Sequence, residues 1–400
     1  MILVYYCFLM INLRPHQLSA LDSMSASNKG QVIVPTGGGK TICMIEDAKR
    51  EFSKDGLKTI VVVAPRILLA NQLSSEFLEL IDDVDVLHVH SGETHHTSTT
   101  KTPEIEEWHW GSRKNQLIFT TYHSLHKIQN AHSVLIDTIY FDESHNAVQK
   151  NFIEAVEYYS MYATRCYFFT ATPKHSRTPM KIGMNDTDIF GEVICNVPAP
   201  KLVKQGYILP PKVIIKKIDV ADDSRFSYEK DCDSVLETID DIDVDKILIC
   251  ARSTKQIINL FSHSTFAKDL HMRGYHWLFI TAKTGGIVDG KKVDREKFFE
   301  TLNTWGKEKD RKFVVCHHSI LSEGINVSGL EAALFLRSMD YITISQTIGR
   351  VIRKGHESKT YGLLVVPCYD KVGISTSRKV NAVVDTVFNK GEAATTVVTR

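Results

Sequence analysis

The stretch that decides the fold is Gln31-Val-Ile-Val-Pro-Thr-Gly-Gly-Gly-Lys-Thr41. Its first residues are β-branched, three glycines follow, and Lys40 and Thr41 open an amphipathic segment that continues to Phe52. A strand, a glycine loop and a helix in this order predict a phosphate-binding loop, because glycines let backbone N–H groups converge on phosphate oxygens and the helix N-terminus adds a positive dipole end. Lys40 would then reach the β- and γ-phosphates, and the Thr41 hydroxyl would bind Mg²⁺. The full pattern has a glycine where this chain has Val34, so a plain glycine-rich turn stays an alternative.

Length and composition are those of an ordinary globular protein. The chain has 400 residues, 43% of them hydrophobic and 24% charged, which predicts two or three domains that each bury a core. The net charge of +1 argues against a wholly basic nucleic-acid coat protein but leaves room for a local basic track. The eight cysteines are widely spaced without a C-x-x-C pair, so we expect no zinc ribbon or iron–sulfur cluster and a reducing, cytoplasmic compartment.

The sequence predicts no membrane association. Residues 1–10 are apolar and aromatic, but they are too short to span a bilayer and lack a basic region and a small-residue cleavage site. We expect them to form an edge strand or a leader. No other segment is long and apolar enough for a membrane helix.

Short apolar runs alternate with helical patterns along most of the chain. The strand-like runs lie at 59–64, 86–90, 117–121, 138–141, 166–170, 246–250, 277–281, 313–316, 332–336 and 361–366. Residues 66–80 carry apolar side chains at helical spacing between two of these runs. Strands separated by helices predict parallel sheets with right-handed crossovers.

Two adjacent carboxylates follow one of the predicted strands, in Tyr140-Phe-Asp-Glu-Ser-His145. In a sheet whose first strand ends in a phosphate loop, this position points at the same crevice. We expect Asp142 to hold Mg²⁺ and Glu143 to orient and deprotonate an attacking water. An isolated Asp-Glu after a strand is also common as a turn, so the pairing with the loop at 36–41 decides the interpretation.

The segment Leu13-Arg-Pro-His-Gln-Leu18 begins a helical pattern ahead of the glycine loop. The Gln17 amide offers both donors and an acceptor, which reading an adenine edge requires. An ordinary helix start at Pro15 is the alternative.

With Phe169-Thr-Ala-Thr-Pro173 at the end of the next strand, the sequence resembles superfamily 2 helicases and translocases. The resemblance runs from Leu13 to about Lys371. Such motors have two tandem RecA-like domains, α/β in class, with mainly parallel sheets flanked by helices and ATP bound between them. We therefore expect an N-terminal RecA-like ATP-binding lobe at 1–200, a connector at 201–212 and a C-terminal RecA-like helicase lobe at 213–400. Prolines on both sides mark the connector.

The resemblance also implies the site residues. The box Asp142-Glu-Ser-His145 is DEAH-like, with serine in place of alanine. Nucleotide contacts are implied for Gln17, Pro35, Thr36, Gly37, Gly38, Gly39, Lys40, Thr41, Gly324, Asn326 and Gln346, with Thr41 and Asp142 as Mg²⁺ ligands. Nucleic-acid contacts at strand ends are implied for Pro65, Arg66, Thr120, Thr121, Arg252, Lys283 and Ser319. At Asn326 the family usually has aspartate.

A basic helix is expected at Gln346-Thr-Ile-Gly-Arg-Val-Ile-Arg-Lys354, whose spacing places Gln346, Gly349, Arg350 and Arg353 on one face. A surface basic helix is the alternative for any arginine-rich stretch. The resemblance implies an arginine-finger helix, and the guanidinium fork suits a transferring phosphoryl group. We expect Arg353 to be the finger, with Arg350 beside it on the γ-phosphate.

The sequence thus predicts an ATP-dependent DNA helicase or translocase that uses ATP and Mg²⁺, with Lys40, Asp142, Glu143, Arg350 and Arg353 as catalytic residues. The glycine loop and the connector look most like those of phage UvsW-type and restriction-enzyme-like DNA motors. DNA is favoured over RNA, and binding should be largely sequence-independent because contacts to phosphates carry no base information. The alternatives are an RNA helicase, the motor subunit of a restriction or remodelling assembly, and a catalytically silent ATP-gated nucleic-acid clamp.

Overall fold

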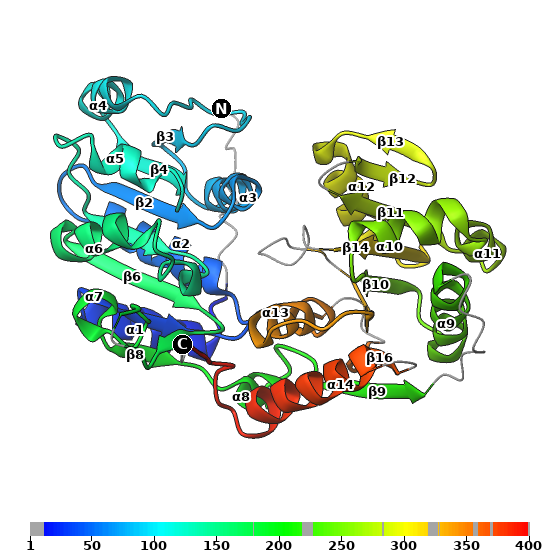
Figure 1. Cartoon of the computed structure of the whole chain (residues 1–400). Helices are drawn as coiled ribbons and strands as arrows, with labels where there is room; N and C mark the ends of the chain where they lie inside the picture. The colour runs from blue at the N-terminus through cyan, green and yellow to red at the C-terminus, as the bar shows by residue number, and fades with distance from the viewer. Residues whose placement is uncertain are drawn as a thin grey trace, which may run out of the picture.

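Two α/β lobes make up the chain (Figure 1), and each is built on one sheet with helices on its faces. The computed structural model describes residues 12–178, 180–217, 227–281, 284–318, 327, 329–354, 359–368 and 371–398. The predicted fold class, α/β with two mainly parallel sheets, is confirmed. The leader or edge strand expected at residues 1–10 lies outside the described residues.

The first sheet has seven strands in the order β3-β4-β2-β5-β6-β1-β8. Its strands are β1 (Lys29–Ile33), β2 (Thr59–Ala64), β3 (Val84–Val89), β4 (Asn115–Thr121), β5 (Thr138–Phe141), β6 (Arg165–Thr170) and β8 (Val193–Asn196). All neighbouring pairs are parallel. Helices cover both faces, which is why the central strands are continuous apolar runs.

The helices of this lobe follow the alternation that the sequence predicts. They are α1 (Pro15–Ala26), α2 (Lys40–Phe52), α3 (Ile67–Leu78), α4 (Thr102–Gly111), α5 (Leu125–Gln129), η1 (Ser144–Asn146), α6 (Ile153–Tyr162), α7 (Thr187–Phe190) and α8 (Ala199–Lys204). Because the strands are parallel, the loops after β1, β2, β4, β5 and β6 all emerge at one edge of the sheet.

The second sheet has eight strands in the order β13-β12-β11-β14-β10-β15-β16-β9. Its strands are β9 (Pro211–Lys217), β10 (Lys246–Cys250), β11 (His276–Thr281), β12 (Gly285–Val288), β13 (Lys291–Val293), β14 (Phe313–His317), β15 (Ala332–Phe335) and β16 (Gly362–Cys368). The hairpin β12–β13 joins this sheet antiparallel to β11. Its Asp289-Gly290 turn is a hairpin signal that our reading of the sequence missed.

The helices of the second lobe are α9 (Ser227–Ile242), α10 (Thr254–Ile258), η2 (Asn259–His263), α11 (Phe266–Met272), α12 (Arg295–Lys307), α13 (Tyr341–Val351), α14 (Lys371–Val384) and η3 (Asp385–Asn389). Among them, α13 extends between the two lobes, in orange in Figure 1. This helix carries the predicted arginine-finger sequence.

The chain crosses between the lobes twice. The first crossing leads from α8 into β9, which pairs with β16 of the second sheet. The second follows α14 and η3 and ends in β17 (Thr396–Val398), which pairs with β7 (Lys174–Ser176) of the first lobe. The division at residues 200 and 212 stays a proposal.

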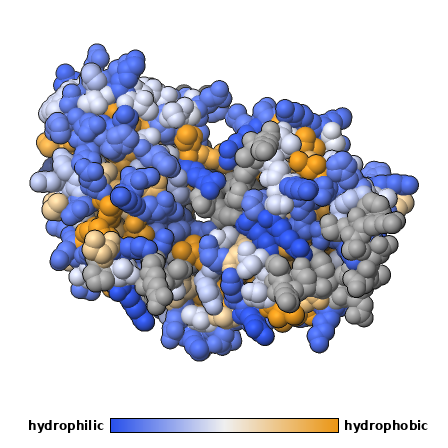
Figure 2. Space-filling view, in the orientation of Figure 1, coloured by the Kyte–Doolittle hydropathy of each residue, from blue (hydrophilic) through white to orange (hydrophobic). Residues whose placement is uncertain are grey.

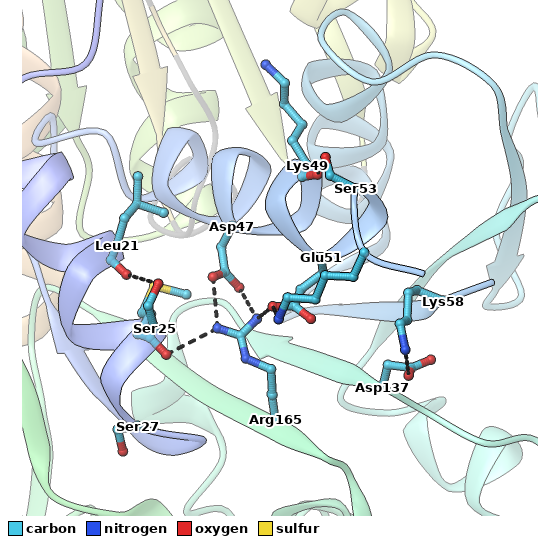
Figure 3. A network of polar contacts seen from close by, with 12 residues as sticks. Leu21, Ser25, Ser27, Asp47, Lys49, Glu51, Ser53, Lys58, Asp137 and Arg165 are labelled. Carbon is cyan, nitrogen blue, oxygen red and sulfur yellow. Dashed lines mark hydrogen bonds and ion pairs between the residues drawn. The ribbon is translucent and has the colours of Figure 1, made fainter. Parts of the chain in front are cut away.

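A buried ion network fastens α2 to the first sheet. In Figure 3 the Arg165 guanidinium at the start of β6 lies between Asp47 and Glu51 of α2. Its Nη1 atom is 2.8 Å from Asp47 Oδ2 and 2.6 Å from Glu51 Oε1. The Tyr140 hydroxyl donates to the same Asp47 oxygen at 2.6 Å, and Arg165 Nη2 donates to the Met24 carbonyl of α1. The helix that follows the glycine loop is therefore held on the sheet by buried charge.

The molecular surface in the view of Figure 2 is mainly hydrophilic, with small apolar groups between polar ones. Within the described part of the chain, no helix has the length and apolar character that crossing a bilayer requires.

Candidate nucleotide site

A cavity of about 850 Å³ lies between the lobes. From the first lobe it is lined by the glycine loop, the start of α2, one face of α3 and the residues after β5. From the second lobe it is lined by Gln346, Arg350, Arg353 and Lys354, and from the connector by Gly206 and Tyr207. Residues that the sequence separates by about three hundred positions thus face one space.

The glycine loop has the backbone that its sequence predicts. Gly37 and Gly39 have φ of 84° and 87°, in the left-handed region that favours glycine. Gly39 is the N-cap of α2, so Lys40 is the first residue of the helix. Lys40 Nζ lies 3.4 Å from Glu143 Oε1, which places the ammonium between the loop and the carboxylates. The helix N-terminus and the ammonium together favour an anion.

The two carboxylates lie at the carboxyl end of β5, each only 6% exposed. Burial and the charge of Glu143 raise the pKa of Asp142 to about 7. Burial alone would also raise the pKa of Glu143, but the charges of Lys40 and His145 outweigh it and the pKa is lowered. Glu143 adopts φ of 45°, a left-handed conformation that is uncommon outside glycine and recurs at functional sites. One carboxyl is thus poised to titrate near neutrality, and the other stays ionised.

The second lobe reaches the loop through α13. Asp340 caps this helix by accepting a hydrogen bond from Thr343 N at 2.7 Å. Arg350 is 3% exposed and its charge helps to lower the pKa of Glu143. Burial lowers the pKa of Arg353, and the charges of Glu76 and Glu143 oppose that shift. Both guanidiniums therefore sense carboxylates of the opposite lobe.

The donor set fits Mg-ATP. Thr41 and Asp142 line the cavity, and hydroxyl and carboxylate oxygens suit Mg²⁺, which takes its remaining ligands from water and phosphates. Among the described residues, the buried atoms without a hydrogen-bond partner include Thr36 Oγ1, Glu143 Oε2 and Gln346 Nε2, whose residues line the cavity. A polar ligand would satisfy such atoms. Gly324 and Asn326, also predicted as nucleotide contacts, lie outside the described residues.

Gln17 lies beneath the loop and is not part of the cavity lining. It is 3% exposed, and its Oε1 accepts from Arg14 N at 2.8 Å, which caps α1. Its Nε2 faces Gly39 so closely that a β-carbon on that glycine would overlap it. Gly38 is likewise absent from the lining, and its carbonyl is 2.7 Å from His16 Nε2.

Several lining residues escaped the sequence reasoning. Arg14 stacks on the ring of Tyr207, with its Cζ atom 4.8 Å from the ring centroid, at the end of the cavity formed by residues 12–15 and 206–207. Gln72 and Glu76 enter from α3. The sequence signals were the arginine three places before Gln17 and the aromatic residue inside the connector, but neither meets the cavity until the lobes are placed together.

A second cavity, of about 1660 Å³, lies between α3 of the first lobe and α12 of the second. It brings together Pro65, Arg66 and Thr121 from the predicted nucleic-acid contacts. Burial and the charge of Arg66 lower the pKa of Arg295, so the two arginines lie close enough across the space to repel each other. An anion such as a backbone phosphate would relieve that repulsion.

Two other predicted nucleic-acid contacts, Thr120 and Arg252, do not line this cavity. Thr120 is fully buried and its hydroxyl donates to the Val89 carbonyl at 2.8 Å. Arg252 Nε donates to the Leu336 carbonyl at 2.8 Å. Lys283 and Ser319 lie outside the described residues.

One family model matches part of the first lobe. Residues 10–175 match the family described as Type III restriction enzyme, res subunit. No curated protein matches the chain.

Solved structures match over both lobes. The Type ISP restriction-modification enzyme LlaBIII bound to DNA superposes with a TM-score of 0.74 at 19% identity, over 97% of this chain and 31% of that one. A fragment described as an HsdR subunit of a type I restriction enzyme from Vibrio vulnificus YJ016 gives 0.63 at 13% identity, over 96% and 68%. S. cerevisiae Dbp5 bound to RNA and ADP BeF3 gives 0.57 at 16% identity, over 96% and 89%. The chain spans about a third of LlaBIII, and the likeness is one of fold.

Proposed function

We propose that this chain, a superfamily 2 motor with a restriction-enzyme-type first lobe, hydrolyses Mg-ATP between its lobes and uses the cycle to move on or remodel DNA. The observation that carries the proposal is the single cavity lined by Lys40, Asp142 and Glu143 on one side and by Arg350 and Arg353 on the other. A fold alone does not establish an activity, but this set of side chains suits phosphoryl transfer.

Each side chain has a part in the proposed reaction. The N–H groups of the glycine loop and the Lys40 ammonium hold the β- and γ-phosphates, and Thr41 with Asp142 would hold Mg²⁺. A bound Mg²⁺ would neutralise charge on the phosphate oxygens. The ionised Glu143 orients the attacking water and takes its proton, and Arg353 stabilises charge on the γ-phosphoryl group. Arg14 and Tyr207, at the other end of the cavity, offer a cation and a ring for the base to stack on.

The second cavity is the proposed nucleic-acid path. It joins strand-end residues of one lobe to α12 of the other, so a backbone lying there would be gripped by both lobes. If the lobes close when ATP binds and open after hydrolysis, the distance between the nucleic-acid contacts of the first lobe and those of the second lobe would change. DNA is the favoured substrate because the first lobe matches a restriction-enzyme family; the UvsW-like activity is a finer form of the same proposal.

The test is ATP hydrolysis measured with single-stranded, duplex, forked and four-way DNA and with RNA of equal length. We expect DNA to stimulate ATP hydrolysis, and this stimulation should fall steeply as the salt concentration rises. We expect no DNA-stimulated hydrolysis in Lys40→Ala. Greater stimulation by RNA would favour an RNA helicase, a reading that the likeness to Dbp5 keeps open. ATP-dependent binding to DNA without hydrolysis would show a clamp instead.

A further inference from the structure

The last turn of α13 is held by a lysine that the proposed chemistry does not use. Lys359 Nζ donates to the carbonyl oxygens of Val351 at 2.5 Å and Arg353 at 3.0 Å. The same ammonium donates to the Leu330 carbonyl at 2.5 Å, just before β15. The Lys359 ammonium therefore joins the C-terminal end of α13 to the residue that precedes β15 of the second sheet.

The carbonyl between those two is held from the connector. Leu209 N donates to Ile352 O at 2.7 Å, and the next connector residue, Pro210, accepts from Gly362 N at 3.0 Å. The last carbonyls of a helix have no partner within it, so each needs one from outside. The carbonyl oxygens of residues 351, 352 and 353 each accept a hydrogen bond. The backbone that carries Arg353 is therefore held by Lys359 and by the connector.

Holding an ammonium here opposes folding. Burial lowers the pKa of Lys359 to about 8, and the positive charge of Lys246 acts in the same direction while Glu331 opposes it. An ammonium has three donors on one atom, and here three carbonyls converge on it.

We propose that Lys359 is a positioning residue that fixes the backbone of Arg353, so that the guanidinium meets the γ-phosphate when the cleft is loaded. This inference rests on the proposed function, since it requires Arg353 to act on the nucleotide. Lys359 lines neither cavity. Its effect is on the rate of hydrolysis rather than on ATP affinity.

The chain offers a matched control. Lys246 is fully buried, and its Nζ donates to the carbonyls of Gly306 at 3.0 Å and Glu308 at 2.5 Å, at the end of α12. It is the same kind of lysine cap in the same lobe, on a helix that lines the second cavity but not the nucleotide cavity, so the two variants are compared in ATP hydrolysis without nucleic acid. Lys359→Met and Lys246→Met each remove one such ammonium while keeping an unbranched side chain.

The experiment measures kcat and KM for ATP hydrolysis without nucleic acid, the affinity for a fluorescent ATP analogue and the Tm of both variants. We expect Lys359→Met to lower kcat by about tenfold or more with nucleotide affinity within about twofold, because a small misplacement of a catalytic group costs up to about 100-fold in rate. Lys246→Met should keep kcat within about twofold. Wild-type kcat in Lys359→Met, an equal loss in Lys246→Met, or a loss of affinity alone would overturn the proposal.

Two further variants keep the result decisive. If Lys359→Met does not fold, Lys359→Gln retains donors for two of the three carbonyls and is compared with Lys246→Gln by the same criteria. Arg353→Ala separates the two levels of inference. If Arg353→Ala hydrolyses ATP at the wild-type rate, the finger assignment fails; if it does not and Lys359→Met is normal, only the role of Lys359 fails.

Discussion

Gly349 of α13 lies directly against Thr36 of the glycine loop, so closely that a β-carbon at position 349 would overlap the Thr36 side chain. The finger helix and the phosphate loop therefore touch across the lobe boundary. Gly349→Ala should push α13 away from the loop and displace both arginines. We expect kcat for ATP hydrolysis to fall by about 10- to 100-fold, since a displacement of about 1 Å can cost that much.

The matched control for this substitution is Gly111→Ala. Gly111 ends α4, and a β-carbon there would meet nothing within 4 Å. Both variants should fold, so an equal loss of activity in both would show that the Gly349 contact has no special part in closing the site.

Glu143→Gln should abolish hydrolysis while the protein stays folded. The amide keeps the shape of the side chain but cannot accept a proton, and loss of a general base costs about 10²- to 10⁴-fold. Single-turnover hydrolysis checks this, with Glu46→Gln on the outer face of α2 as the control; its pair with Lys49 is a helix-surface contact. Normal turnover in Glu143→Gln would refute the assigned base.

Arg353→Ala should keep ATP binding and lose hydrolysis, by about 10³- to 10⁵-fold if it supplies the finger. The measurements are the Kd for a fluorescent nucleotide and kcat at saturating ATP. If nucleotide affinity alone were lost, the finger would have to be Arg350, which lines the same cavity.

Arg165→Met should strongly destabilise the first lobe. Removing the guanidinium leaves Asp47 buried without its counter-charge and leaves Glu51 with only the Lys54 ammonium, 2.6 Å away, and breaking a buried pair costs about 3–5 kcal/mol. The exposed pair of Arg273 with Asp240 is also bidentate, at 2.6 and 2.7 Å, so Arg273→Met makes the same change where water screens it. There we expect about 0–1 kcal/mol. Urea unfolding of both variants measures the difference, and equal losses would contradict it.

The sequence predicted most of the strands because each is a short apolar run that ends in a polar loop. For the same reason the glycine loop and the Asp142-Glu143 pair could be placed at one edge of a sheet before any coordinates were known. The hairpin β12–β13 and the pairing of β17 with β7 were missed, since three- and four-residue strands carry almost no periodic signal.

The site was harder to predict wherever it depends on tertiary contacts. Nothing in the local sequence distinguishes Glu76 from other polar residues of α3, or joins Arg14 to Tyr207 across nearly two hundred residues. Thr120 and Gln17 were selected by motif position, and the structure adds contacts that the motif did not indicate: Thr120 Oγ1 donates to the Val89 carbonyl, and Gln17 Oε1 accepts from Arg14 N. Motif position alone therefore does not tell which other partners a side chain has.

The raised pKa of Asp142 predicts a pH dependence that can be measured without nucleotide. Burial and the charge of Glu143 raise it from an ordinary value of 3.8 to about 7, so between these values the folded state binds more protons than the unfolded state. The stability contribution of this group is present below about pH 4 and is lost as the pH rises to about 7. Asp142→Asn lacks this titration. Its Tm relative to wild type should therefore rise between about pH 5 and 7 and level off above pH 8.

Mg²⁺ provides the complementary measurement. At pH 8 Asp142 is ionised, and a cation held by Thr41 and Asp142 would compensate its buried charge. Millimolar Mg²⁺ should then raise the Tm of wild type but not that of Asp142→Asn, and the effect should shrink as the pH falls below 7 because protons compete for the carboxylate. NaCl at matched ionic strength controls for general screening of charge. A Tm difference between the two proteins that did not change from pH 5 to 8 would show that Asp142 is ionised throughout, and the proposed competition between proton and metal would be wrong.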